Sequence, residues 1–188
     1  MEREKCIFDM DGTLVDSMRY WRRLERDFLT QRGVSIPDME RVLELAKPLP
    51  LYQSVLLFIE RFGLKDTPEQ AMNEMISMMR QHYQSDVKSK PGAEEYLKKL
   101  KKCGVHMCIV TATPRHLVEV CLSRLNLTSY FDFLLSCDEV GAGKDHPDAF
   151  YEAAHRLGSA PSEIAVFEDS LQAAKTAKQA GFYTIGVY

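Results

Sequence analysis

The sequence of 188 residues lacks the features of several protein classes. No apolar run is long enough to cross a bilayer, so no membrane-spanning segment is expected. Positive charge is not in excess. With a net charge of -3 and a pI near 6.0, the chain has no excess of positive charge that would attract nucleic acid. Residues 1–5 are charged and lead directly into an apolar stretch, so no signal peptide is expected either.

Cysteine is scarce, and its pattern does not suggest pairing. The five cysteines are odd in number, widely spaced and include no C-x-x-C pair: Cys6, Cys103, Cys108, Cys121 and Cys137. Most fall in apolar positions of expected strands or helices, and no catalytic context surrounds any of them. This usage indicates reduced, buried thiols in a cytoplasmic protein.

What the chain does contain is enough apolar sequence for a folded core. Its hydrophobic content is 45%, and its length suits one ordinary domain or a core with a small accessory domain. A monomer is expected, with a dimer as the alternative. There is no internal repeat and no low-complexity tract.

The first motif follows a short apolar strand expected at residues 6–8. Asp9 and Asp11 come directly after it, and Gly12 permits a sharp turn because glycine adopts positive φ without steric cost. Both acids therefore lie at the carboxyl end of a strand, where open α/β sheets place their ligands. Two neighbouring anions are tolerated when a cation lies between them or when one is protonated. A plain turn is the alternative interpretation, since turns favour Asp and Gly.

After the first motif, residues 18 to about 83 have the pattern of amphipathic helices. The spacing of apolar residues predicts a first helix from Met18, with Ser17 as its N-cap, that ends at Gly33. Three more helices are expected: one from about residue 37 to before Pro48, one over residues 52–62, and one beginning at Pro68. The methionines of the last helix are interpreted as adaptable core packing, with a pliable surface as the alternative.

From residue 91 onward, strands and helices alternate. Strands are expected at residues 105–110, 131–135, 164–167 and 183–187, with helices between them. This alternation predicts an α/β fold with a doubly wound, parallel, Rossmann-like sheet covered on both faces. We expect the α/β core at residues 1–15 and 87–188, interrupted by a small α-helical domain at residues 16–86.

Polar residues follow the strand expected at residues 105–110. Thr111 offers a hydroxyl, and the backbone N–H groups around Ala112 could face an oxyanion. Thr113 is interpreted as the N-cap of the helix that opens at Pro114. Capping is therefore the structural explanation of this segment, and phosphate binding is the functional one.

Two adjacent acids follow the strand expected at residues 164–167. Glu168 and Asp169 end an apolar, buried stretch, and helix capping would need only one carboxylate. Hard cations such as Mg²⁺ bind through one or two carboxylates. The pair therefore predicts metal ligation by at least one of these acids.

Lys144 lies in a glycine-flanked loop. The loop is not a Walker A motif, because Asp138 stands where the first glycine is required and Asp145 replaces the final Ser or Thr. A lone lysine is usually exposed, but this loop falls at the carboxyl edge of the expected sheet. A carboxylate nucleophile, a carboxylic acid, a hydroxyl, a lysine and an acidic pair together suit phosphoryl transfer.

These residues carry a family resemblance. The segment 9–14 (DMDGTL), Thr111, Lys144 and the pair at 168–169 resemble the four ordered motifs of the haloacid dehalogenase-like (HAD) hydrolases. Residues 167–170, 143–148 and 130–132 resemble the branch that contains phosphoglycolate phosphatases and β-phosphoglucomutases. In that branch a helical cap follows the first motif, as the helical insert does here.

The resemblance implies a mechanism and a set of roles. Asp9 would attack phosphorus to form an aspartyl-phosphate, and Asp11 would protonate the leaving oxygen and then activate water. The cap would close and supply leaving-group specificity. Phosphoryl oxygens would contact Thr111, Ala112 and Lys144, and Mg²⁺ would be held by Asp9, the Asp11 carbonyl and Asp169, with Glu168 in support.

The expected function is a Mg²⁺-dependent phosphatase for a small phosphorylated metabolite. A phosphomutase is the alternative, and the residues that could bind its second phosphate group are Arg19, Arg22, Arg23 and Lys47. A catalytically idle binding protein is a third interpretation. Specificity is expected in residues 16–23, 47–50 and 113–116. One departure from the family is Asp145, which replaces proline and could pair with Lys144 or point away.

Overall fold

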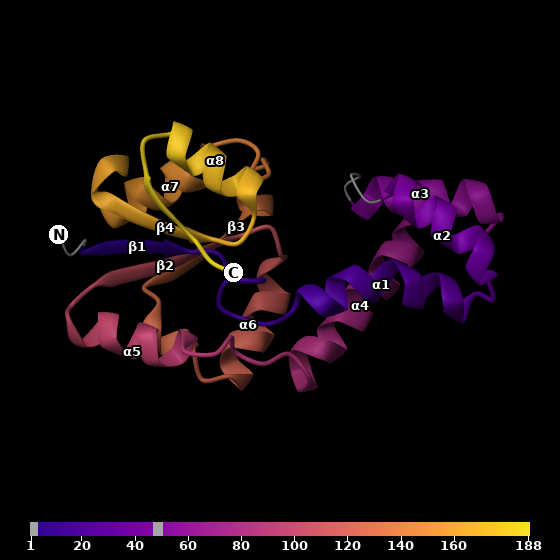
Figure 1. Cartoon of the computed structure of the whole chain (residues 1–188), viewed down its shortest axis with the longest axis horizontal. Coiled ribbons are helices and arrows are strands. Elements are labelled where there is room, and N and C mark those ends of the chain that lie inside the picture. The colour runs from indigo at the N-terminus through magenta and orange to yellow at the C-terminus, as the bar shows by residue number, and fades with distance from the viewer. Residues whose placement is uncertain (1–3, 47–50) are drawn as a thin grey trace. The chain divides into compact units, whose positions relative to one another are not determined.

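The chain forms two compact units (Figure 1). The computed structural model describes residues 4–46 and 51–188. The core unit comprises Met1–Ser17 and Asp86–Tyr188, and the helical unit comprises Met18–Ser85.

A five-stranded parallel sheet forms the centre of the core unit. Its strands are β1 (Lys5–Phe8), β2 (His106–Thr111), β3 (Phe133–Ser136), β4 (Ile164–Glu168) and β5 (Tyr183–Gly186), in the spatial order β3-β2-β1-β4-β5. The first strand of the chain is thus the central one. Such a position requires side chains that are apolar on both faces, and residues 6–8 are all buried.

Helices cover both faces of this sheet. They are α5 (Ala93–Lys102), α6 (Arg115–Arg124), α7 (Asp148–Leu157) and α8 (Leu171–Gln179). Figure 1 shows α7 and α8 on one face and α5 and α6 on the other. The predicted α/β fold with a doubly wound, Rossmann-like parallel sheet is confirmed.

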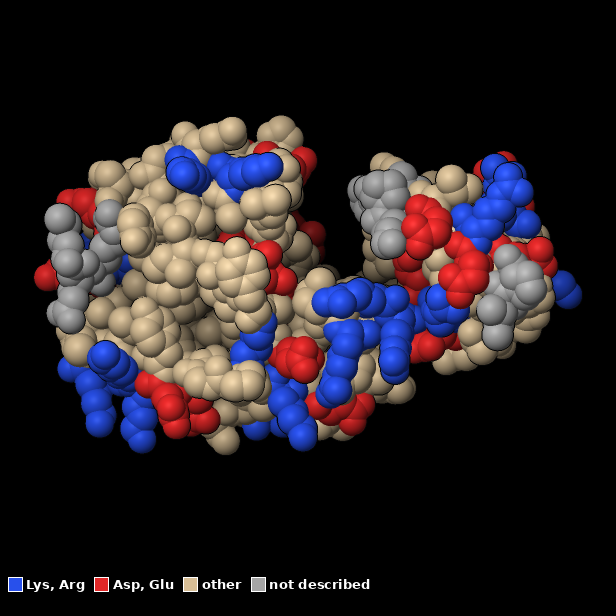
Figure 2. Space-filling view, viewed as in Figure 1, with Lys and Arg blue, Asp and Glu red and all other residues tan. Residues whose placement is uncertain are grey.

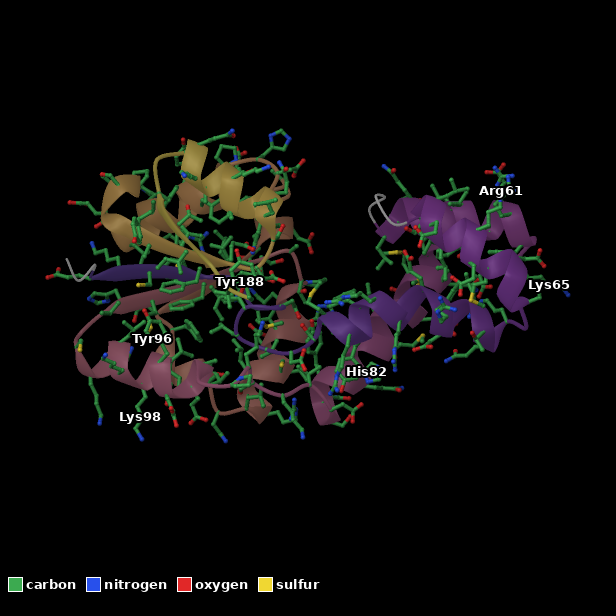
Figure 3. The ribbon with its side chains drawn as sticks, in the orientation of Figure 1. Arg61, Lys65, His82, Tyr96, Lys98 and Tyr188 are labelled. Atoms are coloured by element: carbon green, nitrogen blue, oxygen red, sulfur yellow. The ribbon has the colours of Figure 1, made fainter. Side chains whose placement is uncertain are left out.

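Apolar side chains hold the layers together. Ile7, Val110 and Val166 of the sheet are fully buried in one apolar cluster with Phe150 of α7. Burial of such a side chain contributes roughly 1.5–3 kcal/mol. On the other face, Tyr96 of α5 points toward the sheet (Figure 3), where its ring lies edge-on to Phe167 with centroids 5.7 Å apart.

One predicted strand begins later than expected. The strand was expected at residues 131–135, but β3 begins at Phe133. A short 3-10 helix at Thr128–Tyr130 ends only at Phe131, whose ring packs edge-on against Phe8. Tertiary packing of this aromatic side chain therefore overrides its strand propensity.

The helical unit contains four helices. They are α1 (Met18–Gln31), α2 (Ile36–Ala46), α3 (Leu51–Phe62) and α4 (Pro68–Ser85). The helix start at Pro68 is as predicted, and Thr67 and Gln70 form the reciprocal hydrogen bonds of a capping box. Met75 and Met79 are fully buried, which confirms that these two methionines are core residues.

The two segments that connect the units run beside one another within the core unit. The Asp16 N–H donates to the Lys88 carbonyl at 2.8 Å, and the Lys90 N–H donates to the Leu14 carbonyl at 2.9 Å. The Lys90 ammonium also donates to the Gly12 carbonyl at 2.8 Å. These hydrogen bonds hold both connecting segments against the loop that carries Asp9 and Asp11.

Across residues 4–46 and 51–188, none of the helices combines the length and apolar character that crossing a membrane requires. The segment 47–50, including Lys47, was a predicted specificity loop and lies outside the described residues.

Candidate active site

The ends of β1 and β4 set the frame of the site. Phe8 pairs in register with Phe167, and their rings stack with centroids 4.4 Å apart and planes 9° from parallel. The Asp9 N–H donates to the Phe167 carbonyl at 3.0 Å. Asp9 and Glu168, the next residues on the two strands, consequently lie side by side at the carboxyl edge of the sheet.

Lys144 lies between these two carboxylates. Its Nζ is 2.5 Å from Oδ1 of Asp9 and 2.5 Å from Oε1 of Glu168. The exposed fraction of the side chain is 10% for Lys144, 9% for Asp9 and 1% for Glu168. Residues separated by up to 159 positions thus form one buried ionic cluster. The sequence singled out all three, and the fold brings them together.

Burial dominates the titration of this cluster. It raises the pKa of Asp9 from 3.8 to about 7, although the Lys144 ammonium opposes the rise. Burial also raises the pKa of Glu168, again against the effect of Lys144. For Lys144, burial lowers the pKa, but the two carboxylates outweigh it and hold that pKa above its ordinary value. The cluster carries more acidic than basic groups, so it favours an additional cation.

The carboxylates at this edge fit a divalent metal ion. Ligand oxygens of Asp9, Glu168 and Asp169 lie within 4.8 Å of one another. Oδ2 of Asp9 is buried and has no hydrogen-bond partner among the described residues. A buried carboxylate oxygen without a donor is costly, and a hard cation would satisfy it. The donor set is therefore of the kind that binds Mg²⁺.

Neither of the two adjacent acids is needed to cap α8, so both are available for metal binding. Ser170, not an acid, caps the helix by accepting from the Ala173 N–H at 3.4 Å. Oε2 of Glu168 accepts from the Ser170 N–H at 3.2 Å, so both Glu168 oxygens have protein partners. Asp169 is exposed. Glu168 thus suits a supporting position, and Asp169 is the more available ligand.

Asp11 is held by two hydroxyl groups. Thr113 Oγ1 donates to Oδ2 of Asp11 at 2.7 Å, and Ser17 Oγ donates to Oδ1 at 2.5 Å. The prediction that Thr113 caps the next helix is wrong. The residue before α6 is Pro114, which makes no side-chain cap, because the Thr113 hydroxyl is directed to Asp11 instead.

The segment around Thr111 lies beside Asp11. Thr111 is buried, and its Oγ1 accepts from the Thr113 N–H at 3.1 Å. That contact leaves the Thr111 hydroxyl proton for another acceptor. Ala112 is exposed. A hydroxyl donor and an accessible loop backbone at this edge are the features expected of a phosphate contact.

Asp145 does not intrude on the cluster. Its side chain is 65% exposed and lies beside His146, with Oδ2 3.7 Å from Nε2. Lys144 points inward to its two buried partners. The departure from the family pattern at this position therefore leaves the lysine directed toward the site.

The structure also shows contacts of site residues that the sequence did not reveal. Ser17 and Thr113 were assigned as helix caps, yet both hydroxyls contact Asp11. The Arg115 guanidinium forms two hydrogen bonds to Glu139, at 3.0 and 2.9 Å, and thereby ties the start of α6 to the turn that precedes the Lys144 loop. No motif or spacing marks these contacts, because each joins segments that only the sheet brings together.

The arginines proposed for a second phosphate are exposed on α1. Arg19, Arg22 and Arg23 are all exposed. Figure 2 shows that basic side chains gather over this helix. The Arg19 guanidinium donates to the Tyr20 hydroxyl at 2.7 Å and lies over its ring. The solvent-facing side of any amphipathic helix commonly carries exposed arginines. Their exposure therefore does not identify a phosphate site.

The sequence model described as haloacid dehalogenase-like hydrolase matches residues 6–187. The chain belongs to this family. The resemblance that the motifs suggested is thereby confirmed, and the chain is a hydrolase of the HAD type.

Relatives and solved structures resemble the chain along nearly its whole length. A phosphorylated carbohydrates phosphatase of Thermotoga maritima is 29% identical over 97% of this chain and 83% of its own length. Hexitol phosphatase B of Escherichia coli is 28% identical over 97% of this chain and 82% of its own. Among solved structures, a provisional β-phosphoglucomutase of Thermotoga maritima has a TM-score of 0.80 at 27% identity, covering 97% and 84% of the two chains.

Proposed function

We propose that the chain is a Mg²⁺-dependent phosphatase that hydrolyses a small phosphorylated metabolite through an aspartyl-phosphate intermediate. The observation that carries the proposal is the buried cluster of Asp9, Lys144 and Glu168 beside Asp169. It combines a nucleophile, a cation for phosphoryl oxygens and carboxylates for a metal ion in one place.

The proposed reaction has two steps. The Asp9 carboxylate forms a bond to phosphorus, the bond from phosphorus to the leaving oxygen breaks, and Asp11 gives that oxygen a proton. Asp11 then takes a proton from water, whose oxygen attacks phosphorus and releases Asp9 and inorganic phosphate. Lys144 and the Thr111 hydroxyl contact phosphoryl oxygens, so that their negative charge is balanced in the transition state.

Asp9, Asp169 and the Asp11 carbonyl would hold the Mg²⁺, with Glu168 in support. When bound, the ion would neutralise charge on the phosphoryl group and on the carboxylates around it. Without it, the acidic groups here outnumber Lys144 and would repel a phosphate dianion.

The names of the relatives support a sugar phosphate or a similar metabolite as substrate. Two of them are phosphatases of phosphorylated carbohydrates and of hexitol phosphates. We propose that the helical unit, Met18–Ser85, is the cap that selects the leaving group, as the family resemblance implies. The proposed enzyme works as a monomer in the cytoplasm, without nucleic acid or membrane partners.

A phosphomutase is the second candidate. It shares the first step but returns the phosphoryl group to a product, and the similarity to the provisional β-phosphoglucomutase favours it. The exposed arginines of α1 could bind the second phosphate that a mutase requires. Inorganic phosphate as a stoichiometric product would argue for the phosphatase.

The test is phosphate release from a panel of sugar and polyol phosphates, with Mg²⁺ or with EDTA. We expect release that requires Mg²⁺ and is lost in Asp9→Asn. The matched control is Asp145→Asn, which changes an exposed acid and is expected to keep the activity of the wild type. Full activity of Asp9→Asn would exclude Asp9 as the nucleophile, and undiminished turnover in EDTA would exclude the metal.

A further inference from the structure

Both oxygens of the Asp11 carboxylate are occupied by core hydroxyls. The Thr113 hydroxyl contacts Oδ2 and the Ser17 hydroxyl contacts Oδ1. Thr113 is 5% exposed and Ser17 is fully buried. The orientation of Asp11 is therefore set by neighbours in the fold rather than by solvent.

The backbone of Thr113 is itself fixed by two hydrogen bonds. Its N–H donates to Oγ1 of Thr111 at 3.1 Å, and its carbonyl accepts from Oγ of Ser136 at 3.1 Å. Because Pro114 follows, the backbone here is further restricted. A hydroxyl held this way is aimed at Asp11 in advance, so little entropy is lost when the contact forms.

We infer that Thr113 is a positioning residue that holds the Asp11 carboxyl group for proton transfer. This inference rests on the proposed function, in which Asp11 protonates the leaving oxygen. A hydroxyl suits the task because it is both a donor and an acceptor. It donates to the Asp11 carboxylate, and it can accept when Asp11 carries the proton, so the contact persists in both states.

The effect of losing the Thr113 hydroxyl depends on the leaving group. The alkoxide released from a sugar phosphate is a strong base and needs a proton as its bond to phosphorus breaks. The p-nitrophenolate ion is a weak base and leaves without one. General acid catalysis typically contributes about 10²–10⁴-fold, so a misplaced Asp11 penalises alkyl phosphates and spares aryl phosphates.

The experiment measures kcat/KM for glucose 6-phosphate and for p-nitrophenyl phosphate in wild type, Thr113→Val and Thr113→Ser. This ratio reports the steps up to transfer onto Asp9 and excludes the later attack by water. We expect Thr113→Val to lose at least about tenfold with the sugar phosphate and less than about threefold with the aryl phosphate. Thr113→Ser keeps the hydroxyl and is expected to retain both activities.

Two controls sharpen this test. Thr184→Val removes a threonine hydroxyl on β5, outside the site, and is expected to change neither activity. In an Asp11→Asn background, Thr113→Val is expected to cause no further loss, because the group it positions has already been removed. If Thr113→Val does not fold, Thr113→Ala takes its place.

Equal losses with the two substrates, or an additional loss in the Asp11→Asn background, would show a merely structural role for Thr113 and overturn the inference. No loss with either substrate would also overturn it. Wild type that hydrolyses neither probe nor any member of the panel would instead overturn the proposed function, and the inference with it.

Discussion

Lys144 Nζ lies 2.5 Å from Oδ1 of Asp9, so the buried lysine and the proposed nucleophile form an ion pair. Glu168 forms the second contact of the same ammonium group. The positive charge of Lys144 thus offsets the negative charge of two carboxylates that are largely shielded from water. Its position also leaves it next to the oxygens that a phosphoryl group would bring to Asp9.

Replacing Lys144 is expected to destabilise the fold. Lys144→Met leaves two buried carboxylates without a counter-charge, and breaking a buried pair in this way typically costs about 3–5 kcal/mol. We expect a loss of about 3 kcal/mol at pH 8 in urea denaturation, and a smaller loss at pH 5, where protonation of Asp9 or Glu168 relieves the repulsion. Lys175→Met, an exposed lysine on α8, is the control. A loss below about 1 kcal/mol would contradict the buried ion pair.

The metal-free protein is expected to lose stability as the pH rises. Burial raises the pKa of Asp9 from 3.8 to about 7, so the folded state binds more protons than the unfolded state between these values. The free energy of unfolding should therefore fall across this window, by an amount on the order of 1–4 kcal/mol. Denaturation in EDTA at pH 5 and pH 8 measures the fall. Asp9→Asn should flatten it, and an unchanged slope in this variant would assign the effect to other groups.

Arg32 is expected to be the main polar support of the helical unit. Its guanidinium forms two hydrogen bonds to Asp66, at 2.9 and 2.6 Å, and two to Glu74, at 3.1 and 2.7 Å. It also lies 3.6 Å from the ring centre of Phe28. Arg32→Lys loses the planar fork and the stacking, and we expect a loss of about 2 kcal/mol in the unfolding of this unit.

The matched control for this variant is another arginine of α1. Arg26 pairs with Glu40 at 2.7 Å, but both side chains are largely exposed. Surface pairs of this kind contribute little, so Arg26→Lys is expected to leave the denaturation midpoint unchanged. Equal effects of the two substitutions would contradict the distinction between the network and the surface pair.

Cysteine reactivity should single out one residue. Cys103 is exposed, whereas the other four cysteines are buried. Burial raises the pKa of Cys121 to about 12 and holds that of Cys108 far above its ordinary value, so neither forms a thiolate readily. We expect a maleimide to label the native protein once, and the Cys103→Ser variant not at all on the same timescale. Rapid labelling of that variant would show that the core opens easily.

The elements of the core were predictable because their signals are local. Apolar runs of strand length, alternating with amphipathic helices that glycine ends, predict a parallel sheet, and the structure has one. The rule that ligands gather at the carboxyl ends of parallel strands then placed Asp9, Lys144 and Glu168 at one edge. Short-range patterns sufficed there, since each candidate follows or adjoins a strand that is recognisable from its own residues.

The start of β3 and the partners of Asp11 were decided by the tertiary structure alone. Phe131 was expected to begin the strand, but it lies outside β3, where its ring packs against Phe8. Thr113 reads as a helix cap, and only the pairing of β1 with β2 brings it to Asp11, 102 residues earlier in the chain. The sequence by itself thus determined which residues are available for chemistry. The register of the sheet decided which of them touch, because a hydroxyl bonds to whichever acceptor the packed strands place within reach.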